Sequence, residues 1–195
     1  MQELALVMAA DRVDANEDEF TRLVKLAKTG DSRAFEVIVL RHERRVLTTA
    51  MHLLGGNRED ARDAAQQVFL RLHKHLDRLN ENLAFAGWLY RITVNVCRDI
   101  HRTRAARPTV PLEQAGDVAS VSGSDEAIVR SEQSRMIHAA LATLPEKERA
   151  AVVLRDLEGL TTREVARILG SSEGTVRSQI CHARLKMRQH LRRSS

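Results

Sequence analysis

The sequence is poor in cysteine and has no long hydrophobic run. Cys97 and Cys181 are the only cysteines among 195 residues. They fall in segments that we assign to different domains, so we expect no disulfide and a reducing compartment. No stretch approaches the roughly 18 apolar residues of a membrane span, and the residues through Asp11 do not form a signal peptide. We therefore predict a cytoplasmic protein without membrane insertion.

Motifs of catalysis are missing as well. The chain has no glycine loop that could hold a phosphate, no nucleophile motif and no pair of carboxylates in a pocket pattern. Cys97 and His101 are four residues apart on an expected helix, but a zinc site needs about four ligands and only these two converge. We predict no enzymatic activity, no bound metal and no cofactor.

Most of the chain instead shows the spacing of amphipathic helices. We expect four helices before residue 107, at about 17–28, 31–54, 57–79 and 84–104. Gly30 and the pair Gly55 and Gly56 end the first two helices, and Asp31 and Asn57 can cap the helices that follow. The core face expected for the fourth helix comprises Phe85, Trp88, Leu89, Ile92, Val96 and Ile100. We interpret Trp88 as a core residue rather than as a platform for stacking a base.

Residues 108–124 have no periodicity and are rich in proline, glycine and serine, which is the composition of a linker. No convincing strand occurs in the sequence. These patterns predict an all-α fold of two small helical domains joined by a flexible linker. The expected boundaries are a flexible leader at 1–16, a first domain at 17–107, the linker at 108–124 and a second domain at 125–195.

The second domain ends in the pattern of a helix-turn-helix. A helix is expected from Pro145 to Leu157, and Thr161 with Glu164 can form a capping box at the start of the next helix. A close crossing of two helices needs a small residue at the contact and a glycine at the turn, and Ala166 and Gly170 stand at those places. Either of two serines can cap the last helix, at Ser171 or Ser172.

The last helix has one apolar side and one basic side. Its apolar stripe consists of Val176, Ile180, Ala183 and Met187. The opposite face carries Ser178, Cys181, His182 and Leu185, flanked by Arg177 and Arg188. A helix fits the major groove of DNA, and arginine, serine and histidine can hydrogen-bond to base edges there. We interpret it as a recognition helix; an ordinary helical hairpin with a solvated basic face is the alternative.

Short sequence motifs occur in a fixed order along both expected domains. In the first domain they are Gly30-Asp31, Ala34-Phe35, Asp63, Gln66, Phe69, Phe85, Trp88-Leu89-Tyr90-Arg91-Ile92, Asn95 and Asp99. In the second they are Leu144-Pro145, Glu158-Gly159, Glu164-Val165-Ala166, Leu169-Gly170, Gly174-Thr175-Val176, Ser178 and Ala183-Arg184. Their order and spacing on either side of the linker resemble the extracytoplasmic-function sigma factors of bacterial RNA polymerase, small members of the sigma-70 superfamily.

The resemblance implies a promoter reader in two parts. The first domain would bind core RNA polymerase and would read and open the minus-ten element, and the second would bind the minus-thirty-five element as duplex. Family members are commonly held inactive by an anti-sigma factor, which we expect as a further partner.

Three sets of residues follow from this resemblance. The residues expected to contact duplex DNA are Thr175, Arg177, Ser178, Gln179, Cys181, His182, Arg184 and Arg188. Those expected to contact the melted minus-ten strand are Asn80, Asn82, Arg91, Asn95, Arg98 and Arg102. Those expected to contact the polymerase are Asp60, Asp63, Gln66, Gln67 and Arg71.

The chain departs from the family pattern at a few of these positions. Gln67 stands where the family usually has an acid, and Gln179, Cys181 and His182 stand where relatives often carry an arginine, an aromatic or histidine, and an arginine. We interpret Cys181 as a small side chain near the DNA groove; a thiol sensitive to oxidation is the alternative.

Three rival hypotheses belong to other classes of protein. One is a nuclease or nucleotide-handling enzyme that holds magnesium on the acidic third helix. Another is a free-standing repressor, but such proteins usually dimerise and no extra dimerisation helix is visible. The third is a helical scaffold for other proteins, which leaves the arginine-lined helix unexplained.

Overall fold

The computed structural model describes residues 19–78, 85–106 and 125–194. The expected leader and linker, together with Asn80 and Asn82, lie outside these residues. Residues 19–28 are helical and are followed by α2 (Ser32–Leu53), α3 (Arg58–His75), the short 3-10 helix η1 (Leu76–Arg78) and α4 (Phe85–Ala106). The C-terminal unit contains α5 (Asp125–Ala142), α6 (Glu146–Val152), the π-helical turn η2 (Val153–Leu157), α7 (Thr162–Leu169) and α8 (Glu173–Ser194). Every regular element in the described ranges is helical, and the all-α class is confirmed.

Local signals set the ends of the N-terminal helices. Asp31 caps α2 by accepting hydrogen bonds from the backbone amides of Arg33 and Ala34 at 2.9 and 3.1 Å. Asn57 caps α3 through a bond of 2.9 Å from the amide of Asp60. Between the two helices the chain reverses through Gly55 and Gly56, whose φ angles of 66° and 88° lie in the left-handed region that favours glycine. The predicted caps and turn are confirmed.

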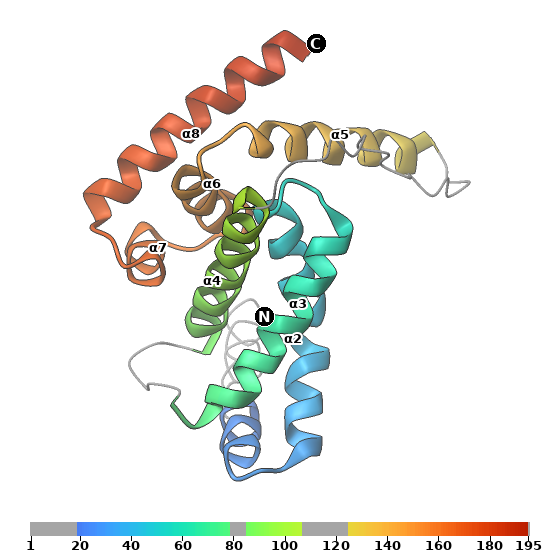
Figure 1. The fold of residues 1–195 in the computed structure, drawn as a ribbon, viewed down its shortest axis with the longest axis vertical. Helices are drawn as coiled ribbons and strands as arrows, with labels where there is room; N and C mark the ends of the chain where they lie inside the picture. The colour runs from blue at the N-terminus through green and yellow to red at the C-terminus, as the bar shows by residue number, and fades with distance from the viewer. Residues whose placement is uncertain (1–18, 79–84, 107–124, 195) are drawn as a thin grey trace, which may run out of the picture.

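The three long helices of this unit pack side by side (Figure 1), with α3 against both α2 and α4. The core face predicted for α4 is only partly correct. Phe85, Leu89 and Val96 are buried, whereas Trp88, Ile92 and Ile100 are partly buried against the core. Tyr90, Thr93, Val94 and Cys97 are also buried, although the predicted stripe omits them. The reason is that α4 has neighbours on more than one side, because α2, α3 and α7 all pack against it.

The C-terminal unit lies directly against the N-terminal one. In Figure 1, α5 crosses the end of the α2–α4 bundle, and α7 lies beside α4. Buried apolar side chains of both units form one continuous cluster, which includes Leu53 and Leu54 of the N-terminal unit and Leu141 and Leu144 of the C-terminal unit. The helix expected to reach Leu157 is α-helical only to Val152. The wider π-helical turn that follows ends at Leu157, is capped by Glu158 and leads to Gly159 with φ 76°.

Candidate nucleic-acid interface

The helix-turn-helix is built from α7 and α8, and a capping box starts it. The hydroxyl of Thr161 accepts a hydrogen bond from the amide of Glu164 at 3.3 Å. The carboxylate of Glu164 accepts bonds from the amide and the hydroxyl of Thr161 at 2.7 and 2.6 Å. These two bonds lower the pKa of Glu164. The turn follows at Gly170, with φ 63°, so both sequence predictions are confirmed.

Two features fix the direction of α8. Ser172 caps its start, because its hydroxyl accepts a hydrogen bond from the amide of Thr175 at 3.1 Å. The predicted stripe faces the protein: Val176, Ile180 and Ala183 are buried, and Met187 is partly buried against the core. The opposite face of the helix is therefore left to solvent.

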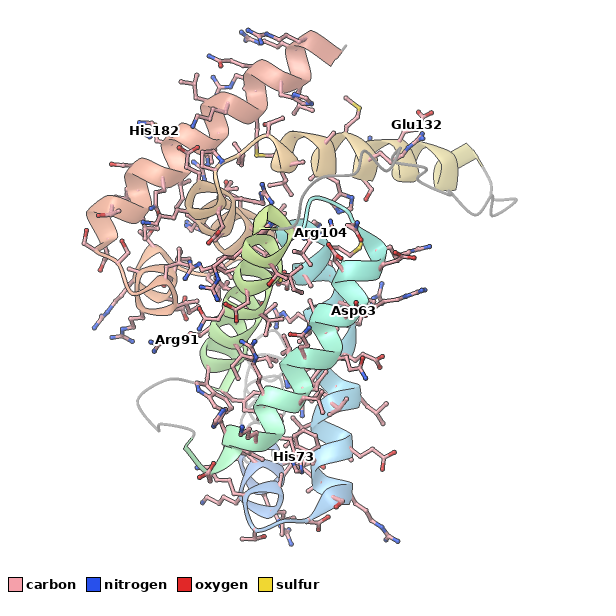
Figure 2. All side chains as sticks on the ribbon, in the orientation of Figure 1. Asp63, His73, Arg91, Arg104, Glu132 and His182 are labelled. Carbon is pink, nitrogen blue, oxygen red and sulfur yellow. The ribbon has the colours of Figure 1, made fainter. Side chains whose placement is uncertain are left out.

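The outer face of α8 carries the side chains that the sequence placed there. Ser178, Cys181 and His182 are exposed, and Leu185 is 51% exposed. Figure 2 shows His182 projecting from the outer side of the helix. Arg177 is 68% exposed and pairs with Glu173, one turn earlier, at 3.0 Å. Exposed pairs of this kind contribute only about 0.3–0.5 kcal/mol, so a phosphate or a base can replace Glu173 as the partner of Arg177.

Four other residues of the expected duplex set lie differently on α8. Arg184 is held by two hydrogen bonds to Asp156 of η2, at 2.8 and 2.7 Å. Gln179 is half-buried, and its Oε1 is covered without a hydrogen-bond partner among the described residues. Thr175 is exposed, with its hydroxyl 2.9 Å from that of Ser172. Arg188 lines a groove of about 570 Å³ between α8 and the α6–η2 segment. Of the eight expected residues, seven are thus exposed on α8 and Gln179 is half-buried.

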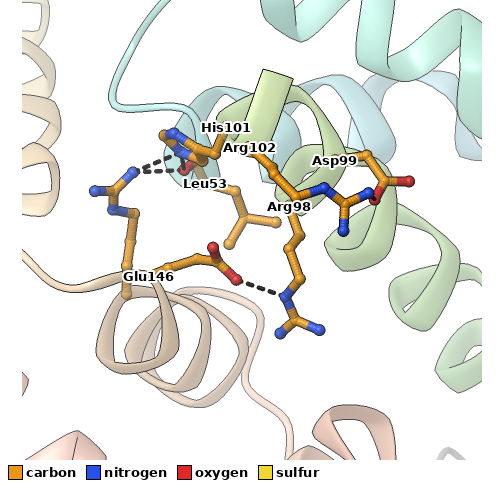
Figure 3. Close-up of polar contacts among 7 residues, drawn as sticks. Leu53, Arg98, Asp99, His101, Arg102 and Glu146 are labelled. Atoms are coloured by element: carbon orange, nitrogen blue, oxygen red, sulfur yellow. Dashed lines mark hydrogen bonds and ion pairs between the residues drawn. The ribbon is translucent and has the colours of Figure 1, made fainter. Parts of the chain in front are cut away.

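The described residues of the minus-ten set all lie on α4. Arg91 and Asn95 are exposed (Figure 2 labels Arg91). Arg98 points toward α6 and pairs with Glu146 at 2.5 Å, as Figure 3 shows. Arg102 is 78% exposed and pairs with Asp99 at 3.0 Å. Among the described residues of this set, Arg91 and Asn95 are the two without an ion pair, whereas Arg98 is held by the C-terminal unit.

The residues expected to contact the polymerase lie on α3. Asp63, Gln66 and Gln67 are exposed, and Figure 2 shows Asp63 on the outer side of the bundle. Arg71 is tied to Asp99 of α4 at 3.0 Å. Asp60 pairs with Arg104 at 2.7 Å and its side chain is only 15% exposed. Burial raises the pKa of Asp60, and the positive charge of Arg104 opposes this effect.

Two exposed leucines, one on α3 and one on α2, were not predicted from the sequence. Leu70 is 64% exposed, and its helical spacing from Asp63, Gln66 and Gln67 places it on the same face of α3. Leu40 of α2 is 66% exposed. A leucine that falls outside the buried stripe of its helix is the signal that could have identified these residues, because exposed apolar groups often mark contacts with other proteins.

The two residues considered for a metal are engaged in packing. Cys97 is buried, and burial raises the pKa of its thiol to about 12. His101 places its Nε2 3.1 Å from the carbonyl oxygen of Leu53 and 2.9 Å from the guanidinium of Arg149. Among the residues that the structure describes, no three histidine, cysteine, aspartate or glutamate side chains are grouped as metal ligands. The described helices include none with the length and apolar character needed to span a bilayer.

An exposed polar helix on a helix-turn-helix scaffold is the mark of a DNA-binding protein, and the comparisons define the family. Residues 38–107 match the family model for sigma-70 region 2, and residues 134–187 match the model for sigma-70 region 4. The ECF RNA polymerase sigma factor SigM of Mycobacterium tuberculosis is 37% identical over 158 residues, which are 81% of this chain and 77% of the relative. The RNA polymerase sigma-H factor of Pseudomonas aeruginosa is 32% identical over 177 residues, 86% of this chain and 91% of the relative.

Two solved structures agree with these matches. CnrH in complex with the cytosolic domain of CnrY superposes with a TM-score of 0.66 at 28% identity, over 89% of this chain and 97% of CnrH. RpoE of Bartonella quintana, solved with the anti-sigma factor NepR, shares the fold with a TM-score of 0.60 at 19% identity, over 81% of this chain and 96% of RpoE. The chain belongs to the extracytoplasmic-function (ECF) sigma factors of the sigma-70 family. It is a sigma factor for promoter-specific initiation of transcription.

Proposed function

We propose that the two units divide promoter recognition between them. The N-terminal unit binds core RNA polymerase through the outer face of α3 and the minus-ten element through α4. The C-terminal unit reads the minus-thirty-five element with α8. The protein acts in the cytoplasm as an initiation factor without an enzymatic activity of its own.

The orientation of α8 is the observation that carries this proposal. Its apolar stripe is buried, so Arg177, Ser178 and His182 are directed outward together. A helix in the major groove reads bases with side chains on its outer face near its N-terminus. Arg177 is one turn from that end and can bond to a guanine through two hydrogen bonds. Its weak pairing with Glu173 leaves it available to DNA.

The outer face of α3 supports the polymerase contact. Asp63, Gln66 and Gln67 lie on the same face of α3 as the exposed Leu70, so this face has an apolar side chain beside polar ones. Protein interfaces commonly have this composition. Asp60 and Arg71 are engaged in ion pairs with α4, so they support this face by holding α3 against α4.

We further propose an anti-sigma partner, since the relative CnrH was solved with the cytosolic domain of CnrY. The groove beside α8 suits a helical partner with acidic residues. Its apolar lining includes Leu141, Val152 and Met187, and it also carries Arg188 and Arg192. Arg184 lines the groove too, but it is already paired with Asp156. An amphipathic helix can place apolar side chains in such a groove and carboxylates against the arginines.

Reconstitution with bacterial core polymerase on a promoter library tests this function. Run-off transcripts should form only when the protein is present. The enriched promoters should share one consensus sequence at the minus-ten element and one at the minus-thirty-five element. Arg177→Ala should relax the choice at one base pair of the upstream word, at a cost of about 1–3 kcal/mol in discrimination. Arg193→Ala, an exposed arginine near the end of α8, is the matched control. Transcripts that form equally without the protein would contradict the proposal.

A further inference from the structure

Glu158 joins the C-terminal unit to three side chains of the N-terminal unit. Its side chain is only 8% exposed. Its Oε1 accepts a hydrogen bond from the hydroxyl of Thr49 at 2.6 Å, and its Oε2 accepts bonds from the hydroxyl of Tyr90 at 2.7 Å and from Arg45 at 3.4 Å. A covered carboxylate is tolerated only where hydrogen bonds or cations satisfy it. Its partners here come from α2 and α4, so the carboxylate is satisfied by contact between the units.

Arg149 makes the reciprocal connection. Its guanidinium donates a hydrogen bond of 2.9 Å to the carbonyl oxygen of Leu53, the last residue of α2. It also donates to the carbonyl oxygens of Leu144 at 2.9 Å and Ala142 at 3.3 Å in its own unit. The last carbonyls of a helix lack partners within the helix and carry partial negative charge. Arg149 therefore ties the end of α2 to the α5–α6 turn.

The backbone of the two units approaches closely beside Arg149. A Cβ atom at Gly55 would lie 3.1 Å from the Cβ of Ala142, and one at Gly56 would lie 3.0 Å from the Cβ of His138. Both distances are shorter than ordinary side-chain contacts. The α2–α3 turn is thus fitted against α5, and the contact is not a loose encounter of two surfaces.

This arrangement is incompatible with a promoter that has both elements. By their names, the minus-ten and minus-thirty-five elements lie roughly 25 base pairs apart, which is about 85 Å of duplex at 3.4 Å per base pair. In the structure α7 of the helix-turn-helix packs on α4 of the minus-ten unit. The whole of α8 has 22 residues, a length of about 33 Å at 1.5 Å per residue. The two reading surfaces cannot reach both elements while the units are in contact.

The contact also engages a residue assigned to DNA. Arg98 of α4 pairs with Glu146 of α6 (Figure 3), so the carboxylate occupies a cation that a phosphate would otherwise bind. We propose that the protein alone adopts a closed, self-inhibited state, latched by Glu158 and Arg149, and that the latch opens before the protein can engage both promoter elements. The promoter part of this inference rests on the proposed function, whereas the closed state itself does not.

Solution scattering of the full chain tests the latch without DNA. The variant Thr49→Val/Tyr90→Phe removes two hydrogen bonds to Glu158 with little change in shape, and its radius of gyration should increase relative to the wild type. Thr93→Val is the matched control, because Thr93 is a buried threonine of α4 whose hydroxyl bonds only within its helix, to Leu89 at 2.9 Å. The control should scatter as the wild type does. A double variant as compact as the control would overturn the proposal.

A covalent lock tests the consequence for the promoter. Cβ atoms in disulfides are about 3.5–4.5 Å apart, and a Cβ at residue 55 would lie 3.1 Å from that of Ala142, so Gly55→Cys/Ala142→Cys needs only a small shift. The oxidised monomer should lose about tenfold or more of its run-off transcription with core polymerase, and reduction should restore it. Gly55→Cys alone, oxidised in the same way, should show no such loss.

Equal transcription from oxidised and reduced protein would overturn the latch. The latch would also be overturned if the disulfide did not form and scattering showed the wild type to be extended. If neither the wild type nor the reduced variant initiates transcription, the proposed function fails instead, and the scattering comparison still decides whether the units are latched.

Discussion

Arg184 of the recognition helix is anchored to Asp156 of the π-helical turn by two parallel hydrogen bonds. Its Nε and Nη2 donate to the two carboxylate oxygens at 2.8 and 2.7 Å. These bonds raise the pKa of Arg184. Because α8 and η2 are separate elements, the pair sets the rotation of the recognition helix relative to the rest of its unit. Bidentate pairs hold geometry better than single contacts do.

Asp156→Asn should therefore lower the free energy of unfolding by about 0.5–1 kcal/mol, since the pair is bidentate but partly exposed. Urea denaturation of the full chain measures this. Glu173→Gln is the control, because it removes the exposed i,i+4 pair with Arg177, which should contribute about 0.3–0.5 kcal/mol. If Glu173→Gln lowers the free energy of unfolding as much as Asp156→Asn does, the bidentate geometry of the Arg184–Asp156 pair adds no stability.

Two glycines of the helix-turn-helix should respond in opposite directions to substitution by alanine. Gly170 has φ 63°, and a Cβ there would meet nothing within 4 Å, so Gly170→Ala should destabilise by about 1 kcal/mol through backbone strain alone. Gly174 lies inside α8, and a Cβ there would touch only Ser172 Oγ at 3.8 Å. Gly174→Ala should stabilise by about 0.5–1 kcal/mol. Thermal unfolding of both variants measures these changes. A melting temperature that shifts in the same direction in both variants would contradict this account.

The elements predicted correctly from the sequence depend on neighbouring residues. Asp31, Asn57, Thr161 and Ser172 form their caps with residues two or three positions away. The buried stripe of α8 follows from helical spacing alone. Such features are visible in a short window of sequence, because the physical interaction lies within that window.

What the sequence did not reveal depends on residues far apart in the chain. Tyr90 reaches Glu158 across 68 residues, and Thr49 reaches it across 109. The additional buried positions of α4 exist because α2, α3 and α7 all pack against this helix. The helical period of α4 alone does not show how many neighbours surround it. For the candidate site, the exposed positions of Arg177, Ser178 and His182 followed from the stripe, whereas the anchoring of Arg184 required knowledge of where η2 lies.

His42 should make the stability of the N-terminal unit depend on pH. Its ring packs against Phe20 and Phe85, at centroid distances of 5.4 and 5.2 Å. Burial lowers its pKa to about 4, and the charges of Arg41 and Arg45 act in the same direction. The unfolded chain therefore binds a proton before the folded one does, and stability falls as the pH drops from about 6.5 to about 4.

Denaturation at pH 7 and at pH 4.5 measures this loss. The contribution of His42 should be about 1–2 kcal/mol, below the full value of its shift because the ring is only partly buried. The free energy of unfolding of His42→Leu should fall by about 1–2 kcal/mol less than that of the wild type between pH 7 and pH 4.5. An acid sensitivity that is the same in the wild type and in His42→Leu would assign the effect to other groups.

The contact between the units should weaken in acid through a pair of histidines. His52 of α2 and His138 of α5 face each other with ring centroids 5.3 Å apart. Burial lowers the pKa of both; for His52 the charge of His138 adds to this effect, while the nearby Glu158 opposes it. Separated units expose both rings and bind protons more readily, so the closed state should lose stability as the pH falls below about 6.5. The radius of gyration should rise between pH 7.5 and pH 5.5 in the wild type and stay nearly constant in His138→Gln. Circular dichroism checks that the helices remain folded in both proteins. A wild type that stays compact to pH 5.5 would show that protonation of this pair does not open the contact.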